Sequence, residues 1–470
     1  MTSTPTPGLA ASRPRPSLSE LYARGKSLRS TCHRSAHAGW VAPADRPDPL
    51  SLLARSNRGR LPELVPIRHG RMLKSPFTFF RGAALNMAAD LARTPVSGMR
   101  VQACGDCHLL NFGAYATPER RHVFDINDLD ETLPAPWEWD VKRLAASLVL
   151  ACRSTGFSAG AARDAALACV GSYRRRMAEY SDMTVLEVWY ASMDVDKLLK
   201  LIKDKEAGRE AERRVAAARA RDVREHDFPK LAAARGQVPL IKDNPPLIYH
   251  PTGEGEHDLL TRGRLAWAGY RRSLQDDRRA LLDRYELKDV AIKVVGVGSV
   301  GTYCCIMLLM ASEKDPLFLQ VKEAQASVLA PYVDYKMPFT NNGQRVVVGQ
   351  RLIQGSPDIF LGWGEADGRH FYVRQLADMK GGIKLDENDA VALGAFNHYC
   401  MLCGWALALA HAKSGDPAMI AGYCGNSDAL DDAIAKFGAA YAKQTERDHA
   451  TLEKARRSGR IRVAAEALIK

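Results

Sequence analysis

GDCHLLNFGAYATPERRHVFDINDLDE, residues 105–131, is the stretch from which the rest of the chain is best interpreted. Asp106 and Asn111 lie five residues apart near its start, and the strand-like segment HVFDIND follows with Asp125 and Asp128. A carboxylate can orient or deprotonate a hydroxyl group, and carboxylate and amide oxygens are suitable ligands for Mg²⁺. The pattern therefore favours a magnesium-dependent phosphoryl-transfer site. The alternative is a polar loop whose Asp and Asn residues only turn the chain.

Three motifs, in their order and spacing, resemble those of aminoglycoside-phosphotransferase-like kinases. Kinase catalytic loops place the base and an Asn five residues apart and take a metal-binding Asp from the next strand. GDCHLLN, FDIND and PWEWDVKRLAAS follow the order of the HGDxHxxN, IDFDD and DPxxDLA motifs of those kinases, and Asp140 lies in the third. The resemblance implies that Asp106 acts on the acceptor hydroxyl. It also implies that Asn111 and Asp125 bind Mg²⁺, with Asp128 as a second metal candidate.

A glycine-rich stretch, GVGSVGT, follows about 190 residues later and contains Gly296, Gly298, Ser299 and Gly301. A dinucleotide-binding loop would be followed by a helix, but the strand-like CCIMLLM comes next here. A glycine loop between two strands is typical of the loop that covers the ATP phosphates in kinases. We expect Lys322, in the strand-like FLQVKEA, to reach the α- and β-phosphates. The alternative is an ordinary hairpin turn with a surface lysine.

Some features depart from the kinase pattern. A kinase pairs its strand Lys with a Glu on a neighbouring helix, but the predicted helix GQRVVVGQRLIQ contains no acid. Glu323 adjoins Lys322 and is expected to point to the opposite strand face, so Gln350 is the remaining, weaker partner. His108 lies close to Asp106 and either contacts substrate or phosphate or is structural. These departures keep two alternatives open, a nucleotide-binding pseudokinase and a nucleotidyl (AMP) transferase.

The order of the segments is reversed relative to an ordinary kinase, in which the glycine loop and its Lys precede the catalytic loop. We therefore expect an α+β, two-lobed, kinase-like fold that is circularly permuted, with a helix-rich large lobe. The cut would fall between a long helix ending near His411 and the Asp106 loop. The chain is expected to divide into a disordered basic Pro-rich arm (1–47), a helical lobe with the catalytic loop and metal-binding segment (48–235), a linker helix and β-rich nucleotide-binding lobe (236–385), and a helical return (386–470).

The composition is that of an ordinary globular chain, with 46% hydrophobic and 26% charged residues among 470. No apolar run is long enough for a membrane span and no apolar segment follows the first arginines, so a cytoplasmic protein without a membrane partner is expected. The net charge is +12, and residues 1–75 carry 13 Lys/Arg against 4 Asp/Glu. Such an arm can bind nucleic acid, but a solvated arm is more common, and nucleic-acid binding is not expected.

Ten cysteines without a secretory signal are expected to be reduced thiols. CGDCH, which contains Cys104 and Cys107, matches a c-type haem attachment motif, so a haem or redox protein is a further alternative. Cys400 and Cys403 repeat the CxxC spacing inside an apolar helical run, where Cys behaves as a small hydrophobic residue. The two pairs lack the usual spacing of a zinc ribbon.

Long motifs between Arg60 and about Gly425 are similar to the bacterial domain of unknown function (DUF) 2252 family. They include LPELVPIRHGRMLKSPFTFFRGAA, GDCHLLNFG, FDINDLDET, KVVGVGSVGT and LFLQVKEAQ. The grouping of this family with kinase-like folds agrees with the residue patterns. The combined expectation is an ATP- and Mg²⁺-dependent phosphotransferase acting on an unidentified hydroxyl of a small molecule or protein.

Overall fold

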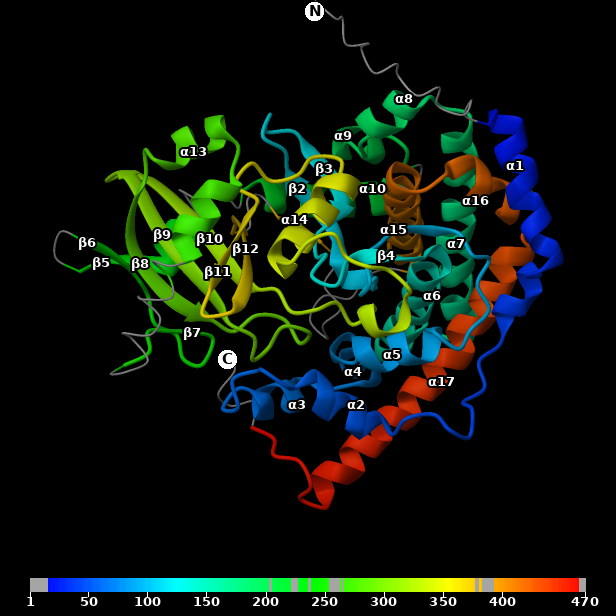
Figure 1. The fold of residues 1–470 in the computed structure, drawn as a ribbon, viewed down its shortest axis with the longest axis horizontal. Coiled ribbons are helices and arrows are strands. Elements are labelled where there is room, and N and C mark those ends of the chain that lie inside the picture. Colours follow the sequence, from blue (N-terminus) through cyan, green and yellow to red (C-terminus); the bar gives the residue numbers. More distant parts are fainter. Residues whose placement is uncertain are drawn as a thin grey trace, which may run out of the picture.

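The computed structural model describes residues 16–202, 205–220, 227–235, 238–252, 263, 266–376, 380–382 and 393–464. An antiparallel sheet lies on one side of the molecule and a body of helices on the other (Figure 1). Both the N-terminal and the C-terminal parts of the chain belong to the helical body, and the middle of the chain forms the sheet. The α+β class is therefore confirmed.

The sheet has six strands in the order β11-β12-β10-β9-β8-β7. Its strands are β7 (Ile248–Tyr249), β8 (Glu286–Lys293), β9 (Cys304–Ser312), β10 (Asp315–Glu323), β11 (Gly362–Ala366) and β12 (Arg369–Gln375). The glycine-rich stretch connects β8 to β9, and Lys322 lies near the end of β10, as the sequence predicted. Helix α14 (Asn342–Ile353), also predicted, lies between β10 and β11 in the chain.

The two faces of the sheet are covered differently. Because successive side chains of a strand alternate between faces, Phe318 and Lys322 share one face of β10. Helix α14 packs on that face, where its Val346 joins a buried cluster with Tyr372. The outer part of the same face is covered by α11 (Phe228–Leu231) and by the hairpin β5 (Ala232–Arg235) and β6 (Val238–Ile241), with the rings of Phe228 and Phe318 6.5 Å apart. The opposite face packs against Tyr270 and α13 (Asp276–Leu282).

The largest core lies in the helical body. Its long helices are α6 (Trp137–Ser154), α7 (Ala159–Ser181), α15 (Leu393–Ser414) and α17 (Ala429–Arg457), and its shorter ones are α8 (Val185–Tyr190), α9 (Val195–Leu199), α10 (Lys205–Arg219) and α16 (Pro417–Cys424). Helix α15 is the one described helix long and apolar enough to cross a membrane. It packs along α7 with buried Phe396, Cys400 and Leu407, which is the environment of a core helix.

Two small hairpins position the stretch 105–131. Strand β1 (Arg100–Ala103) pairs with β4 (Leu133–Pro136), and β2 (Phe112–Ala116) pairs with β3 (His122–Ile126). The 3₁₀ turn η3 (Leu109–Asn111) precedes β2. The strand predicted around Asp125 is thus present as β3.

The expectation of a disordered arm over 1–47 is wrong for residues 16–47, whereas residues 1–15 lie outside the described residues. Helix α1 (Leu18–Ser27) starts at a capping box and packs on α16 so closely that a Cβ on Gly25 would lie 1.9 Å from the carbonyl oxygen of Met419. The turns η1 (Leu28–Ser30) and η2 (Arg34–Ala38) follow. Arg46 then bridges the buried Asp90 and Asp448. The basic residues therefore order this segment by binding other parts of the chain, which composition does not reveal.

Four helices lead from this segment toward β1 and the stretch 105–131. They are α2 (Pro49–Ser56), α3 (Val65–Leu73), α4 (Pro76–Gly82) and α5 (Ala84–Leu91). A separate 3₁₀ turn, η5 (Ala330–Tyr332), lies between β10 and α14. Ser75 caps α4. A break at Ala83, whose backbone is not helical, separates α4 from α5.

Candidate functional site

A cavity of about 620 Å³ is bounded by the glycine loop, β10, the stretch 105–131 and α4. Eight of the ten site residues predicted from the sequence line it: Asp106, His108, Asn111, Asp128, Gly296, Gly298, Ser299 and Lys322. The other two, Asp125 and Gly301, do not line it. Segments that are about 190 residues apart in the chain therefore share one cavity.

The loop that carries Asp106 is held by its backbone. Asp140 on α6 accepts hydrogen bonds from the N–H groups of Cys104 (2.6 Å) and Gly105 (3.1 Å), and His411 of α15 lies 3.2 Å from the same carboxylate. Gly105 has a φ of +81°, and a Cβ there would lie 2.4 Å from the carbonyl oxygen of Glu131. Only glycine fits this position without strain. Asp140, in the third kinase-like motif, thus holds the loop of the first motif, which carries Asp106.

Asp106 lies at the floor of the cavity beside a cation. Its Oδ1 accepts hydrogen bonds from both Nε (2.8 Å) and Nη2 of Arg143, and its own carbonyl accepts one from Asn111 Nδ2 at 2.7 Å. Burial raises the pKa of Asp106 to about 6, against the opposing effect of Arg143. His108 Nε2 lies 3.9 Å from Asp106 Oδ2, and burial holds the pKa of His108 well below its usual range, so its ring is neutral.

Lys322 joins the two halves of the site. Its Nζ lies 2.6 Å from Asp130 Oδ2 and 3.3 Å from Asp128 Oδ1. Burial alone would lower the pKa of Lys322, but the two carboxylates raise it well above its usual value, and the amine is charged. Asp130 also accepts hydrogen bonds from Ser299 (3.3 Å) and from the hydroxyl of Tyr372. Thus the glycine loop, Lys322 of β10 and the acidic stretch (residues 125–131) meet at the carboxylate of Asp130.

The two neighbouring carboxyls differ in their pKa. Burial tends to raise the pKa of Asp128, but Lys322 and Arg374 lower it below its usual value. Burial and the charge of Asp128 raise the pKa of Asp130. Asp128 is therefore the more readily ionised of the two, as a cation ligand must be.

The glycine loop is held against the loop that carries Asp106. A Cβ on Gly298 would lie 3.8 Å from Asp106 Oδ2. Arg60 donates hydrogen bonds to the carbonyls of Val300 (2.6 Å) and Gly298 (2.8 Å). Gly301, with a φ of +89°, accepts one from the N–H of Leu61 at 2.7 Å, so its role is to shape the loop.

Asp125, predicted as a principal metal ligand, is occupied elsewhere. Its carboxylate accepts hydrogen bonds from the N–H groups of Gly355 (2.7 Å) and Ile126 (2.8 Å) and from the hydroxyl of Tyr115 (3.3 Å). Asp125 does not line the cavity, and its carboxylate ties β3 to the loop after α14, whereas Asp128, the second metal candidate, does line the cavity.

Helix α14 supplies no carboxylate to Lys322, as its sequence indicated. Its buried Arg345 donates to the carbonyls of Thr132 (2.6 Å) and Asp130 (2.9 Å), and so holds the acidic stretch in place by its backbone. Gln350 is buried and lines the cavity, and its Nε2 has no hydrogen-bond partner among the described residues. The partners of Lys322 therefore come from the acidic stretch, where no prediction placed them.

Three further residues complete the site. Asp130 belongs to the same acidic stretch, and Arg143 lies three residues after Asp140 on α6, so spacing within these motifs could have pointed to both. Arg374 of β12 lines the cavity and donates to the carbonyl of Asn127 at 2.7 Å. Nothing in its local sequence signals this, because its position depends on strand pairing.

The cavity also gathers positive charge suited to a polyanion. Its lining includes the cationic side chains of Arg60, Arg68, Arg81, Arg120, Lys322, Arg374 and Lys380. Burial, followed by the charge of Arg374, lowers the pKa of Lys380 to about 7, so an added anion would favour its protonated form.

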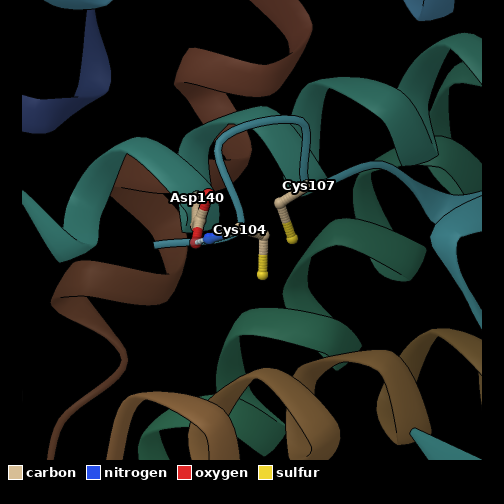
Figure 2. A group of neighbouring side chains, drawn as sticks. All are labelled: Cys104, Cys107 and Asp140. Carbon is tan, nitrogen blue, oxygen red and sulfur yellow. Dashed lines mark hydrogen bonds between the residues drawn. The ribbon is translucent and has the colours of Figure 1, made fainter. Parts of the chain in front are cut away.

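Cys104, Cys107 and Asp140 form a second cluster of metal-type ligands (Figure 2). A contact with Cys107 and burial raise the pKa of Cys104 well above its usual value, and burial raises the pKa of Cys107 to about 12. Metal ligation needs the thiolate. The Asp140 carboxylate already accepts two backbone N–H groups, and Cys104 and Cys107 are each 1% exposed inside the main core. The cluster is therefore a packed core feature, and this burial opposes the haem alternative.

Comparison with protein families adds one finding. The model of the family described as "Uncharacterized protein conserved in bacteria (DUF2252)" matches residues 60–455. The chain belongs to the DUF2252 family. No curated protein and no solved structure matches the chain.

Proposed function

We propose that the protein is a kinase-like phosphotransferase that transfers the γ-phosphoryl group of Mg²⁺-ATP to a hydroxyl acceptor. The observation that carries the proposal is the meeting of three distant segments at Asp130. Ser299 of the glycine loop and Lys322 of β10 both contact this carboxylate, while Gly298 lies against Asp106. Phosphoryl transfer depends on such positioning and charge neutralisation.

The residues have separate roles in this proposal. Asp106 orients the acceptor hydroxyl and receives its proton. The backbone of the glycine loop and the amine of Lys322 hold the nucleotide phosphates. Asp128 and the amide oxygen of Asn111 offer the hard oxygen ligands that Mg²⁺ needs, and the ion would neutralise phosphate charge when bound. His108, neutral and buried beside Asp106, is a positioning residue.

We further propose that the fold is a circularly permuted, two-lobed kinase-like fold. The order β8, glycine loop, β9, β10, α14, β11, β12, α15 follows that of a kinase small lobe and its connection to the large lobe. The end of α15 lies against β1, since Ser414 Oγ accepts a hydrogen bond from the N–H of Gln102 at 3.1 Å. These are the two ends that an unpermuted chain would join. Ten free cysteines fit a reducing, cytoplasmic location.

Nucleotide binding tests the proposal directly. Mg²⁺-ATP should raise the midpoint of thermal unfolding of the full chain, and ATP without Mg²⁺ should do so less. Lys322→Met and Asp128→Asn should each lose most of the shift. Lys314→Met is the matched control, because Lys314 is exposed on the turn that leads into the same strand. Equal shifts in the Lys322 variant and the control would refute the assignment of the phosphate site.

Product analysis then identifies the reaction. Mass spectrometry of candidate acceptors, and of the protein itself, after incubation with Mg²⁺-ATP should show addition of a phosphoryl group. Addition of AMP would instead identify a nucleotidyl transferase. Tight binding with neither product across acceptor classes would favour the pseudokinase alternative, to which the missing helix Glu points.

A further inference from the structure

One cation of the cavity forms no hydrogen bond or ion pair within the part of the chain that the structure describes. Arg81, at the end of α4, lines the cavity, and no described residue forms a hydrogen bond or an ion pair with its guanidinium. Its Nε is buried without a partner. By contrast, Arg60 and Arg374 donate to backbone carbonyls, and Lys322 pairs with carboxylates. A buried donor without an acceptor costs free energy unless a ligand supplies one.

The guanidinium of Arg81 is next to the glycine loop on its catalytic side. Its Nη2 would lie 3.8 Å from a Cβ on Gly296, and a Cβ on Gly298 would lie 3.6 Å from the carbonyl oxygen of Arg81. Arg81 is also close enough to Asp106 and Asp128 to interact with their charges. The group therefore lies between the expected phosphate-binding loop and the carboxylate that faces the acceptor.

The local fold holds Arg81 in place before any ligand binds. The capping box of Ser75 and Thr78 starts α4, and Phe79 and Phe80 of the same short helix are buried. The guanidinium of Arg143, which binds Asp106, stacks on the ring of Phe80 with 4.2 Å between its Cζ and the ring centroid. The helix that carries Arg81 is thus joined to the catalytic loop through one aromatic contact.

We infer that Arg81 binds the terminal phosphate of the nucleotide and neutralises the charge that develops on it during transfer. The inference rests on the proposed function. In that step the bond from the γ-phosphorus to the bridging oxygen breaks with its electron pair left on the β-phosphate. The acceptor oxygen bonds to phosphorus, and its proton passes to Asp106. The transferred group must lie near Asp106, where Arg81 is, and a guanidinium can bind two phosphate oxygens at once.

Comparison of two nucleotides isolates this contact. Binding of Mg²⁺-AMP-PNP, which has a terminal phosphate, and of Mg²⁺-ADP, which lacks it, is measured by calorimetry on the full chain. Arg81→Gln should weaken AMP-PNP binding about 10- to 100-fold and leave ADP binding within about twofold. Arg81→Lys should weaken AMP-PNP binding less, because it keeps the charge. Arg58→Gln, which removes an exposed arginine near the end of α2, is the control and should change neither affinity.

The outcomes separate this inference from the proposed function. The decisive variant is an Arg81→Gln protein that unfolds at the same temperature as the parent. If its affinity falls equally for both nucleotides, or falls for neither, the role of Arg81 is overturned. If Lys322→Met still weakens both nucleotides in that case, the proposed nucleotide site stands. A parent protein that binds neither nucleotide overturns both.

Discussion

Replacing Asp140 by Asn should loosen the loop that carries Asp106 while leaving the surrounding helices packed. The carboxylate receives two backbone N–H groups, from Cys104 and Gly105, and faces Nε2 of His411. An Asn side chain has one acceptor oxygen, so one buried N–H loses its partner and faces an NH₂ group. Hydrogen bonds to a charged group contribute about 1.5–3 kcal/mol each, and we expect a local loss of about 2–3 kcal/mol. That loss makes opening of the loop about 30- to 140-fold more frequent.

Hydrogen–deuterium exchange measured by mass spectrometry checks this value on peptides that cover residues 102–111. The Asp140→Asn variant should exchange faster there by the expected factor, with little change in peptides from α17. Asp432→Asn is the matched control, because Asp432 forms an exposed ion pair with Arg163 and such pairs contribute less than about 1 kcal/mol. Unchanged protection of the loop in the Asp140 variant would show that other contacts hold it.

Three further predictions concern stability. Arg46→Ala should destabilise the chain by about 3–5 kcal/mol in denaturant unfolding, because it leaves the buried carboxylates of Asp90 and Asp448 without their cation. An arm that were disordered would show no such effect. Gly105→Ala should destabilise by more than about 2 kcal/mol, since its Cβ would meet the carbonyl of Glu131 at a positive φ. Burial raises the pKa of the Glu131 carboxyl from 4.5 to about 7, so its contribution to stability is lost as pH rises through that interval. Glu131→Gln should therefore gain up to about 3 kcal/mol relative to the parent between pH 5 and pH 8, and an equal difference at both pH values would contradict the burial of this group.

Local patterns were sufficient for the individual elements of the site. The strand-like segment around Asp125 is β3, and the glycines around Gly298 lie in a loop between β8 and β9 as predicted. The helix predicted over 343–354 is α14, which spans Asn342–Ile353. Each of these features depends on neighbours within a few residues of the chain, and such local features can be predicted from a single sequence.

Pairings between distant segments could not be obtained in this way. Asp125 and Asp128 have similar local sequence, but Asp125 accepts a hydrogen bond from the distant Gly355, whereas Asp128 lines the cavity. The ion pair of Lys322 with Asp130 joins positions 192 residues apart. Because helix α14 contains no Glu, the sequence indicated no ion-pair partner for Lys322. The structure shows that its partners are Asp128 and Asp130 of the acidic stretch.

The sequence by itself determined the polar and glycine-rich motifs, several of the short strands and loops that carry them, and membership of the family. Only the tertiary structure decided which carboxylates face the cavity, that residues 16–47 are ordered, and that Arg81 lines the cavity without a hydrogen bond to any described residue. The reason is physical. Periodicity and glycine conformation act over one or two turns of chain, whereas burial and ion pairing arise when segments hundreds of residues apart exclude water between them.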